Sequence, residues 1–304
     1  LGQARLLEHR LDPRRIGVSI GAETSRPNID DIAEEARLRR AHSSSRVYRA
    51  VSPKDFLIMA PSFPATVVAN LAGAAGPNLT ASTACNSAAQ AIGDALRILR
   101  RGHADVMVTG GTDNLVDRLI LLGLSLLGAL STRAESPETA CRPFDQTRDG
   151  LVLGEGAGFL VLERAEHARR RGAITLGRLL GYGCSSDAEG IVPDAHHGRG
   201  LALAIKAALR DARIEPGEVN YLNAHGNGTQ KSDAAETSAI HNAFGQAAKD
   251  IAVSSTKSMM GHLGAACGAV ELIVCLKAIE ARVAPPTINY QIPDPMCDLD
   301  YVPN

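Results

Sequence analysis

Apolar and polar positions along the chain form two kinds of segment. Short, nearly continuous apolar runs are typical of buried strands. They occupy residues 15–22, 80–85, 104–113, 156–164, 219–226 and 251–257. Longer segments with a helical apolar period span residues 86–101, 200–212, 233–244 and 262–281. A further apolar run at 175–184 follows a basic helical piece.

Continuous apolar strands separated by helices predict an α/β fold with covered sheets. We expect a division near residue 170, with one α/β half over residues 1–170 and a second over residues 171–304. Two of the predicted strands end in chemistry-bearing residues just before a helix. In open α/β sheets, ligands bind in the crevice at the carboxyl ends of strands, so the functional site is expected there.

Composition narrows the class of partner. The chain has 304 residues, of which 45% are hydrophobic, so it can bury a sizeable core. The formal net charge is −1, Trp is absent and aromatic residues make up 3%. This gives no electrostatic or stacking basis for binding nucleic acid, nor a basis for binding an anionic membrane. The longest apolar run, residues 119–131, is too short and too broken by glycine to span a bilayer.

The six cysteines are sparse for this length and include no C-x-x-C pair. Zinc is therefore not expected, and neither is a disulfide framework. The simplest interpretation is a cytoplasmic protein in a reducing compartment.

Cys85 lies where a predicted strand meets a predicted helix, in the stretch "TASTACNSAAQAIGDALRILR". A helix N-terminus carries partial positive charge and N–H groups that stabilise a thiolate or a developing oxyanion. The small residues that follow would let a substrate approach closely. Taken alone, Cys85 is also compatible with an inert buried cysteine, which is common for this residue type.

Two histidines in glycine-rich turns change that balance. The stretch "NAHGNGTQKSD" places His225 at a strand end, and "SSTKSMMGHLGAACGAVELI" places Lys257 at a strand end with His262 at a helix start. A lone histidine is usually structural. Two in such turns, together with a thiol at a similar junction, indicate nucleophilic acyl chemistry.

Four ordered segments resemble the β-ketoacyl-[acyl-carrier-protein] synthases, which are condensing enzymes of the thiolase superfamily. They are the stretch around Cys85, "ACRPFDQTRDGLVLGEGAGFLVLERAEHARRRGA", and the two histidine motifs. The likeness runs over nearly the whole chain and is greatest to the elongating type II enzymes of fatty-acid synthesis. It implies a thiolase-like fold with two similar α/β halves, layered helices and mixed sheets.

The resemblance assigns roles by motif position. Cys85 would be the acylated nucleophile, His225 and His262 the paired histidines, Lys257 their supporting lysine, and Glu271 a structural acidic residue near that lysine. An acyl group would move from acyl carrier protein to Cys85. Malonyl carrier protein would then lose CO₂, and its enolate would attack the acyl-cysteine.

In this scheme two neutral histidines donate Nε2–H to the enolate oxygen, and the helix start at His262 depresses that residue's pKa. Decarboxylation drives the reaction, so neither a metal nor another cofactor is expected. The implied partners are acyl carrier protein with its phosphopantetheine-linked acyl and malonyl groups, and a second copy of the chain in a homodimer.

The chain departs from the family pattern in two places. Asn227 stands where the family usually has a threonine that touches the pantetheine arm, whereas Thr229 matches the pattern. Asn227 and Thr229 are therefore expected to bind substrate, with an altered carrier geometry. The strand and helix expected before residue 15 and the Gly-Phe-Gly-Gly loop expected after residue 304 do not occur, which indicates an incomplete record of a longer enzyme.

Other candidate residues have structural interpretations. Asp233 and Glu236 have the D-x-x-E spacing of helix capping, which makes Asp233 a supporting residue. The loop "CRPFDQTRDG" is interpreted as a structural ion-pair loop. The segment "GEGAG" at 154–158 opens a strand, so close packing is favoured over phosphate binding.

Three alternatives to a fatty-acid synthase remain open. The same fold serves polyketide pathways. A non-catalytic partner subunit of the chain-length-factor kind would lack the nucleophile, so Cys85 counts against it. A thiolase would use a second cysteine as base, and the Lys257–His262 motif favours the synthase over it. Acyl chain length is not determined by these patterns.

Overall fold

The computed structural model describes residues 1–6, 11–23, 57–188 and 198–303, together with isolated positions between residues 33 and 40. The chain forms two compact units that are each discontinuous in sequence. The first contains residues 1–126, 155–174 and 263–270, and the second contains residues 127–154, 175–262 and 271–304. Among the described residues, no helix is long and apolar enough to cross a membrane. The division at residue 170 stays a prediction.

The first unit is built on a mixed four-stranded sheet. Its strands are β1 (Ile16–Ala22), β2 (Asn78–Ala81), β3 (Val106–Asn114) and β4 (Glu155–Glu163), in the order β2-β1-β3-β4. Strand β1 runs parallel to both β2 and β3, whereas β4 pairs antiparallel with β3. Every residue of β1 is buried, as expected for a central strand covered on both faces.

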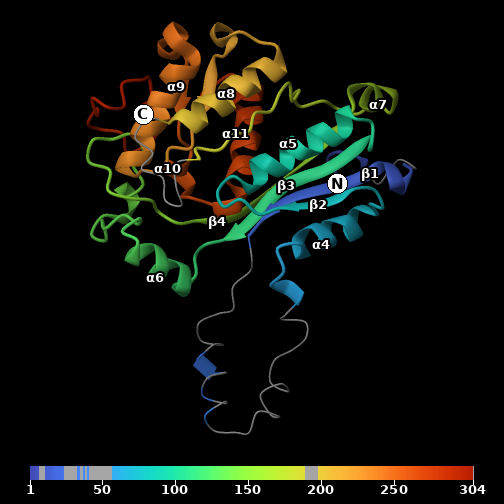
Figure 1. The fold of residues 1–304 in the computed structure, drawn as a ribbon, viewed down its shortest axis with the longest axis horizontal. Coiled ribbons are helices and arrows are strands. Elements are labelled where there is room, and N and C mark those ends of the chain that lie inside the picture. Colours follow the sequence, from blue (N-terminus) through green and yellow to red (C-terminus); the bar gives the residue numbers. More distant parts are fainter. Residues whose placement is uncertain are drawn as a thin grey trace. The chain divides into compact units, whose positions relative to one another are not determined.

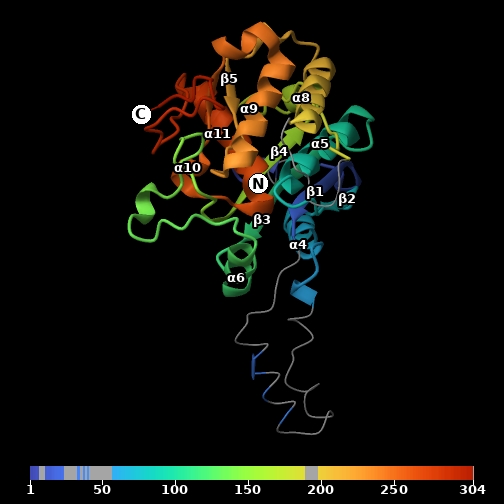
Figure 2. The same ribbon diagram turned by 60° about the vertical axis from the view of Figure 1, so that its left-hand side comes forward.

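Helices cover both faces of this sheet (Figures 1 and 2). On one face, Val18 and Ile20 form a core cluster with α4 (Phe63–Ala72). On the other face lies α5 (Ser87–Arg100), whose buried Ala95 and Leu99 contact Met107 of β3. Successive side chains of a strand point to opposite faces of the sheet. The side chains of β1 and β3 therefore contact α4 and α5 in alternation. The unit also contains α6 (Arg118–Leu126) and α7 (Ala165–Arg170).

The start of α5 is pressed against the carboxyl end of β1. A Cβ atom on Gly21 would lie 2.3 Å from the backbone nitrogen of Ala88, and one on Gly111 would lie 2.6 Å from the Ala88 Cβ. Glycine is needed at both positions because the helix backbone occupies the space of a side chain. The contact fixes the first turn of α5 against two neighbouring strands.

The second unit has a parallel pair of three-residue strands and four helices in its described part. They are α8 (Arg199–Ala212), β5 (Tyr221–Asn223), α9 (Gln230–Phe244), β6 (Ala252–Ser254), α10 (Lys257–Met260) and α11 (Cys267–Ala281), whose first turn belongs to the first unit. The core combines Ile240 and Phe244 of α9 with Val253 of β6. Phe144 stacks on Tyr301 within this core, with ring centroids 4.0 Å apart.

The ion-pair interpretation of the loop around residue 145 is confirmed. Arg142 pairs with Asp145 at 3.2 Å, and Arg148 pairs with Asp294 at 2.6 Å and with Asp233 at 3.4 Å. The Arg148 guanidinium also donates to backbone carbonyls of residues 145, 229 and 230. Arg148 is 2% exposed, so its charge has lost contact with water. The carboxylates and carbonyls around it replace the water as acceptors.

The long periodic elements follow the sequence prediction closely. The predicted strands at 15–22, 104–113 and 156–164 correspond to β1, β3 and β4, and the predicted helices at 86–101 and 200–212 to α5 and α8. The segment "GEGAG" leads into β4, as predicted. The strands predicted at 219–226 and 251–257 are shorter, at three residues each, and the run at 175–184 has irregular backbone.

The contact between β1 and α5 can be tested by Gly21→Ala. The added methyl group has no room unless the helix backbone moves, so we expect a loss of about 1–3 kcal/mol in the free energy of unfolding. Denaturant unfolding followed by circular dichroism measures this loss. The matched control is Gly217→Ala, where no atom lies within 4 Å of the added Cβ. Equal stability of the two variants would show that the helix start is not tightly fixed.

Candidate active site

Cys85 precedes Asn86, the N-cap residue of α5, in the first unit. The predicted position of the thiol at the start of a helix is thus confirmed, and Cys85 is half-buried there. The residue before it, Ala84, has φ +52°, a left-handed conformation that costs energy in a residue with a side chain. Such strain is concentrated at functional sites, where the surroundings maintain it.

The strand predicted over residues 80–85 is wrong beyond Ala81. Strand β2 ends at Ala81, and the chain then turns so that Thr83 and Cys85 form only an isolated bridge. The turn arises because Ala84 N–H donates to the carboxylate of Glu23 and not to a neighbouring strand. Cys85 therefore projects from a turn.

In the second unit, His225 follows β5 in a turn that a buried carboxylate holds. Glu236 accepts from the backbone N–H of His225 and from that of Gly226, both at 2.7 Å. Gly226 has φ +35°, and a Cβ there would lie 2.5 Å from the Cβ of Ser255. The glycine thus allows the turn, and the carboxylate satisfies its two donors.

The capping interpretation of Asp233 and Glu236 is wrong, although Asp233 does lie in the first turn of α9, where an acidic residue stabilises the helix macrodipole. Helix α9 begins three residues earlier, at Gln230 with Thr229 as N-cap, so neither acidic residue caps it. Asp233 instead accepts from the backbone N–H of Phe144 at 2.8 Å and of Gly228 at 3.2 Å. Both acidic residues of this turn of α9 therefore bind the loop that carries His225.

Burial opposes ionisation of these carboxyl groups and the backbone donors favour it. Burial raises both pKa values, and the N–H groups that donate to the two carboxylates lower them. Burial is the larger effect, so the pKa of Asp233 is raised to about 6 and that of Glu236 to about 7. The spacing in the sequence identified both residues as candidates. Their role depends on hydrogen bonds to backbone N–H groups elsewhere in the second unit, which the spacing does not reveal.

His262 lies between α10 and the 3₁₀ turn Gly264–Ala266, and it is 4% exposed. Its backbone N–H donates to the Val152 carbonyl at 2.7 Å, and its own carbonyl accepts from Gly154 N–H at 2.9 Å. These two bonds fix the position of the residue on the segment before β4.

Lys257 is the first residue of α10 and is 1% exposed. Its ammonium group pairs with the Glu271 carboxylate, as the resemblance implies for these two residues. Burial and then the Lys257 charge lower the pKa of His262 to about 4. The same two causes, followed by the neighbouring His262, hold the pKa of His225 well below its usual value.

The predicted cause of this shift is wrong, although its direction is right. Helix α11 begins at Cys267, five residues after His262, so no α-helix starts at His262. A buried position near a fixed ammonium group explains why the ring stays neutral. A neutral ring can donate from one nitrogen and accept at the other.

The fold brings the two histidines together within the second unit. Their ring centroids are 5.5 Å apart and the ring planes make an angle of 83°. The pair comes from two separate glycine-rich turns. A small group could therefore meet both imidazoles.

Asn227 faces His225, and its side-chain orientation is fixed. Its Oδ1 accepts from the backbone N–H and from the hydroxyl of Thr229, both at 2.9 Å. A backbone N–H only donates, so the oxygen must lie on that side and the amide nitrogen on the other. The amide nitrogen is 3.4 Å from Nε2 of His225. An amide nitrogen only donates, so this contact requires an unprotonated Nε2 and puts the ring proton on Nδ1.

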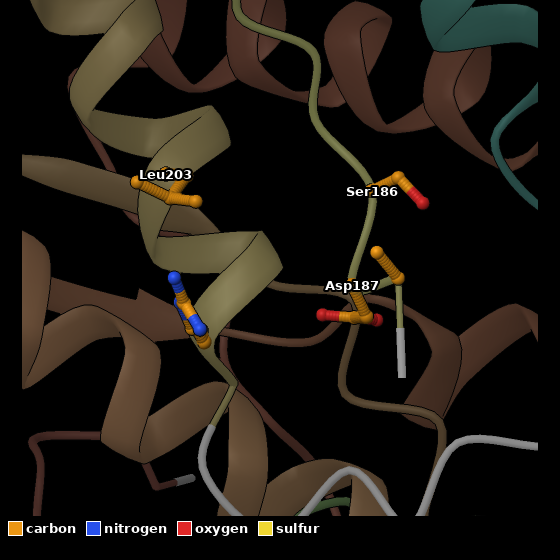
Figure 3. Close-up of a pocket in the computed structure, with 5 residues that line it drawn as sticks. Ser186, Asp187 and Leu203 are labelled. Carbon is orange, nitrogen blue, oxygen red and sulfur yellow. The ribbon is translucent and has the colours of Figure 1, made fainter. Parts of the chain in front are cut away.

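A separate hollow lies at the start of α8. Ser186 and Asp187 line it together with Ala188, Arg199 and Leu203 (Figure 3). Asp187 accepts from the Gly200 N–H at 3.0 Å, which explains its position there. None of the predicted site residues lines this hollow.

Family models match both parts of the chain. The β-ketoacyl synthase N-terminal domain matches residues 1–168, and the β-ketoacyl synthase C-terminal domain matches residues 176–291. The chain belongs to the β-ketoacyl synthase family.

Curated relatives agree with this assignment. The chain is 44% identical over 290 residues to 3-oxoacyl-[acyl-carrier-protein] synthase 2 of Staphylococcus aureus strain COL, covering 95% of the chain and 68% of the relative. It is 42% identical over 303 residues to the protein of the same name from Synechocystis sp., covering 100% of the chain and 71% of the relative. The chain thus spans somewhat more than two thirds of each relative.

Solved structures show the same fold. A β-ketoacyl synthase from Burkholderia phymatum has a TM-score of 0.86 and 33% identity, covering 98% of the chain and 70% of that structure. A ketosynthase solved with its type II polyketide acyl-carrier protein has a TM-score of 0.85 and 37% identity, covering 96% and 72%. The predicted family, thiolase-like fold and acyltransferase class are therefore confirmed.

The resting tautomer of His225 can be tested by ¹⁵N NMR of the histidine-labelled protein. Nε2 of His225 should resonate at the position of an unprotonated ring nitrogen, and Asn227→Ala should increase the population with a proton on Nε2. His225→Gln assigns the signal. Asn242→Ala, at an exposed position of α9, is the matched control and should leave the spectrum of His225 unchanged. A protonated Nε2 in the parent protein would contradict the amide contact.

Proposed function

We propose that the chain acts as a 3-oxoacyl-[acyl-carrier-protein] synthase in fatty-acid synthesis. It would join an acyl group to malonyl carrier protein and extend the chain by two carbons. The names of the curated relatives support this activity. The structural observation that carries it is the pair of imidazoles in the second unit, His262 buried and His225 half-buried, whose pKa values burial and the Lys257 charge lower.

Cys85 is the proposed nucleophile. Its sulfur attacks the thioester carbonyl of acyl carrier protein, a new thioester forms on Cys85, and the carrier leaves as its thiol. Cys85 lies just before the N-terminus of α5, and the partial positive charge of that helix end would favour the developing negative charge.

His225 and His262 are the proposed binding groups for the malonyl thioester. Loss of CO₂ leaves an electron pair that is delocalised onto the thioester oxygen, and imidazole N–H groups stabilise that oxygen. The enolate carbon then attacks the carbonyl of acyl-Cys85. Collapse of the adduct expels the Cys85 thiolate and releases 3-oxoacyl carrier protein.

The contact with Asn227 adds a step to this scheme. In the resting protein, Nε2 of His225 accepts from the Asn227 amide, so it carries no proton to donate. An arriving substrate oxygen would have to displace that amide, and donation from Nε2 would require the ring to take up a proton from water at Nε2 and to lose the Nδ1 proton to water. Asn227 and Thr229 thus stay proposed substrate-binding residues, with Lys257, Glu271 and Asp233 in supporting positions.

The alternatives are ordered by the same observations. A ketosynthase of a polyketide pathway is the second candidate, because one matched structure is a ketosynthase of that kind. A non-catalytic partner subunit would not need Cys85. The homodimer and the cytoplasmic location stay predictions from the resemblance and the composition.

We expect the acyl group to be found on Cys85 after incubation with acyl carrier thioester. Burial raises the pKa of Cys141 to about 12 and those of Cys275 and Cys297 to about 11, so these thiols stay protonated at neutral pH. Mass spectrometry of peptides locates the adduct, and Cys85→Ser serves as the matched control. Acylation of any other cysteine with Cys85 unmodified would overturn the assignment.

Cys85→Gln should abolish condensation but keep malonyl decarboxylation, because the histidines are intact. Adding His225→Ala or His262→Ala to this variant should lower the decarboxylation rate by about 10²–10³-fold, as for the loss of an oxyanion donor. Release of CO₂ from malonyl carrier protein measures the rate. His241→Ala, at a histidine on the C-terminal end of α9, is the control. If both active-site variants decarboxylate at the parent rate, the histidine roles are wrong.

A further inference from the structure

The turn that presents Cys85 is tied to a carboxylate far away in the sequence. Glu23 directly follows β1, at the carboxyl end of the sheet. Its Oε1 accepts from the backbone N–H of Ala84 at 2.8 Å, and its Oε2 accepts from the hydroxyl of Ser82 at 3.0 Å. All of these groups belong to the first unit.

Ser87 closes the same network from the helix side. Its buried hydroxyl lies 3.0 Å from Oε1 of Glu23 and 2.7 Å from the carbonyl of Ala84, and it accepts from Thr83 N–H at 2.8 Å. A hydroxyl has one proton, so it donates to one of these two oxygens at a time. Either way, the hydroxyl connects the turn to the first residue of α5.

The network explains how the left-handed conformation of Ala84 is maintained. A residue with a side chain at φ +52° needs compensating contacts. The ladder of β2 has already ended at Ala81, so the N–H of Ala84 has no strand to pair with. The Glu23 carboxylate supplies the acceptor. Cys85 is the next residue, so its direction follows from this bond.

We propose that Glu23 is a positioning residue for Cys85: its carboxylate fixes the strained turn that aims the thiol. The proposal rests on the proposed role of Cys85 as nucleophile. Glu23 touches neither substrate nor the reacting atoms, and acts through the backbone of Ala84. As a like charge disfavours a second negative charge nearby, the proposal further predicts that removing the carboxylate charge will favour the Cys85 thiolate.

These two effects predict opposite results for two substitutions. Glu23→Ala removes the acceptor, so the turn relaxes and acylation of Cys85 should slow by about 10²-fold, the scale of a small misplacement of a reacting group. Glu23→Gln keeps an oxygen acceptor for Ala84 N–H and removes the charge. It should restore most of the acylation rate and shift the pH profile of Cys85 alkylation to lower pH.

The experiment measures single-turnover acylation by acyl carrier thioester and the alkylation rate of Cys85 with iodoacetamide from pH 6 to 10. Glu166→Ala, at an exposed carboxylate of α7 in the same unit, is the matched control and should behave as the parent. Circular dichroism and denaturant unfolding report whether each variant is folded, and malonyl decarboxylation reports whether the second unit is intact. If Glu23→Ala does not fold, Glu23→Asp replaces it, since the shorter carboxylate cannot hold the same turn.

The outcomes separate the two proposals. Slow acylation in Glu23→Ala or Glu23→Asp with rescue and a shifted pH profile in Glu23→Gln supports the positioning role. Parent-like acylation in Glu23→Ala or Glu23→Asp, or a Glu23→Gln variant as slow as Glu23→Ala with an unshifted profile, overturns it and leaves the role of Cys85 intact. Failure of the parent protein to acylate Cys85 at all would instead overturn the proposed function.

Discussion

One buried carboxylate controls the geometry of the histidine half of the site. Glu236 takes the backbone N–H groups of His225 and Gly226 on its two oxygens. Beyond the last residue of β5 these donors have no strand to pair with, and an unsatisfied buried N–H group is costly. The carboxylate therefore allows a strand to end in a buried turn, and the turn in turn places His225 beside His262.

The same solution occurs in the other unit, at the thiol. A reactive residue follows a strand end, the backbone turns through a left-handed or glycine conformation, and an acidic side chain from another element accepts the freed N–H. A carboxyl group suits this task because, when ionised, it brings only acceptors. It does not compete for the lone pairs that a thiol or an imidazole needs for chemistry. Glu23 and Glu236 are thus related by function in the fold, although they lie on different elements.

The sequence predicted the long elements and the reactive residues, but not the side chains that hold them. Strands β1 and β3 and helices α5 and α8 have strong periodic signals, so their ranges agree with the structure within a few residues. Cys85, His225 and His262 stand out because they occur in glycine-rich or small-residue turns after apolar runs. The role of Glu23 depends on a hydrogen bond to a residue 61 positions away, which no local pattern encodes. The position of Glu23 directly after a predicted parallel strand could have identified it as a candidate. The carboxyl ends of neighbouring parallel strands lie at the same edge of a sheet, where sites form.

Asp233 and Glu236 show how a correct pattern leads to a wrong role. Their D-x-x-E spacing is typical of a helix cap, but α9 starts three residues before Asp233 and buries both of them. Likewise, the low pKa of His262 was expected from a helix end and arises instead from burial and a lysine charge. In both cases local reasoning identified the residue, and tertiary packing determined the physical cause.

The buried carboxyl groups and the imidazoles of the second unit affect the pH dependence of stability in opposite directions. Asp233 and Glu236 have pKa values raised to about 6 and 7, so between pH 4 and 6 the folded state holds more protons on them than the unfolded chain does, and their contribution to stability falls as pH rises. The imidazoles have lowered pKa values, about 4 for His262, so the unfolded chain holds more protons there and their contribution rises with pH up to about 6.5. The two slopes have opposite sign over the same interval. Unfolding of this unit near pH 5 to 6 therefore releases protons from the two carboxyl groups and takes up protons on the two imidazoles, and these two exchanges with the buffer offset one another.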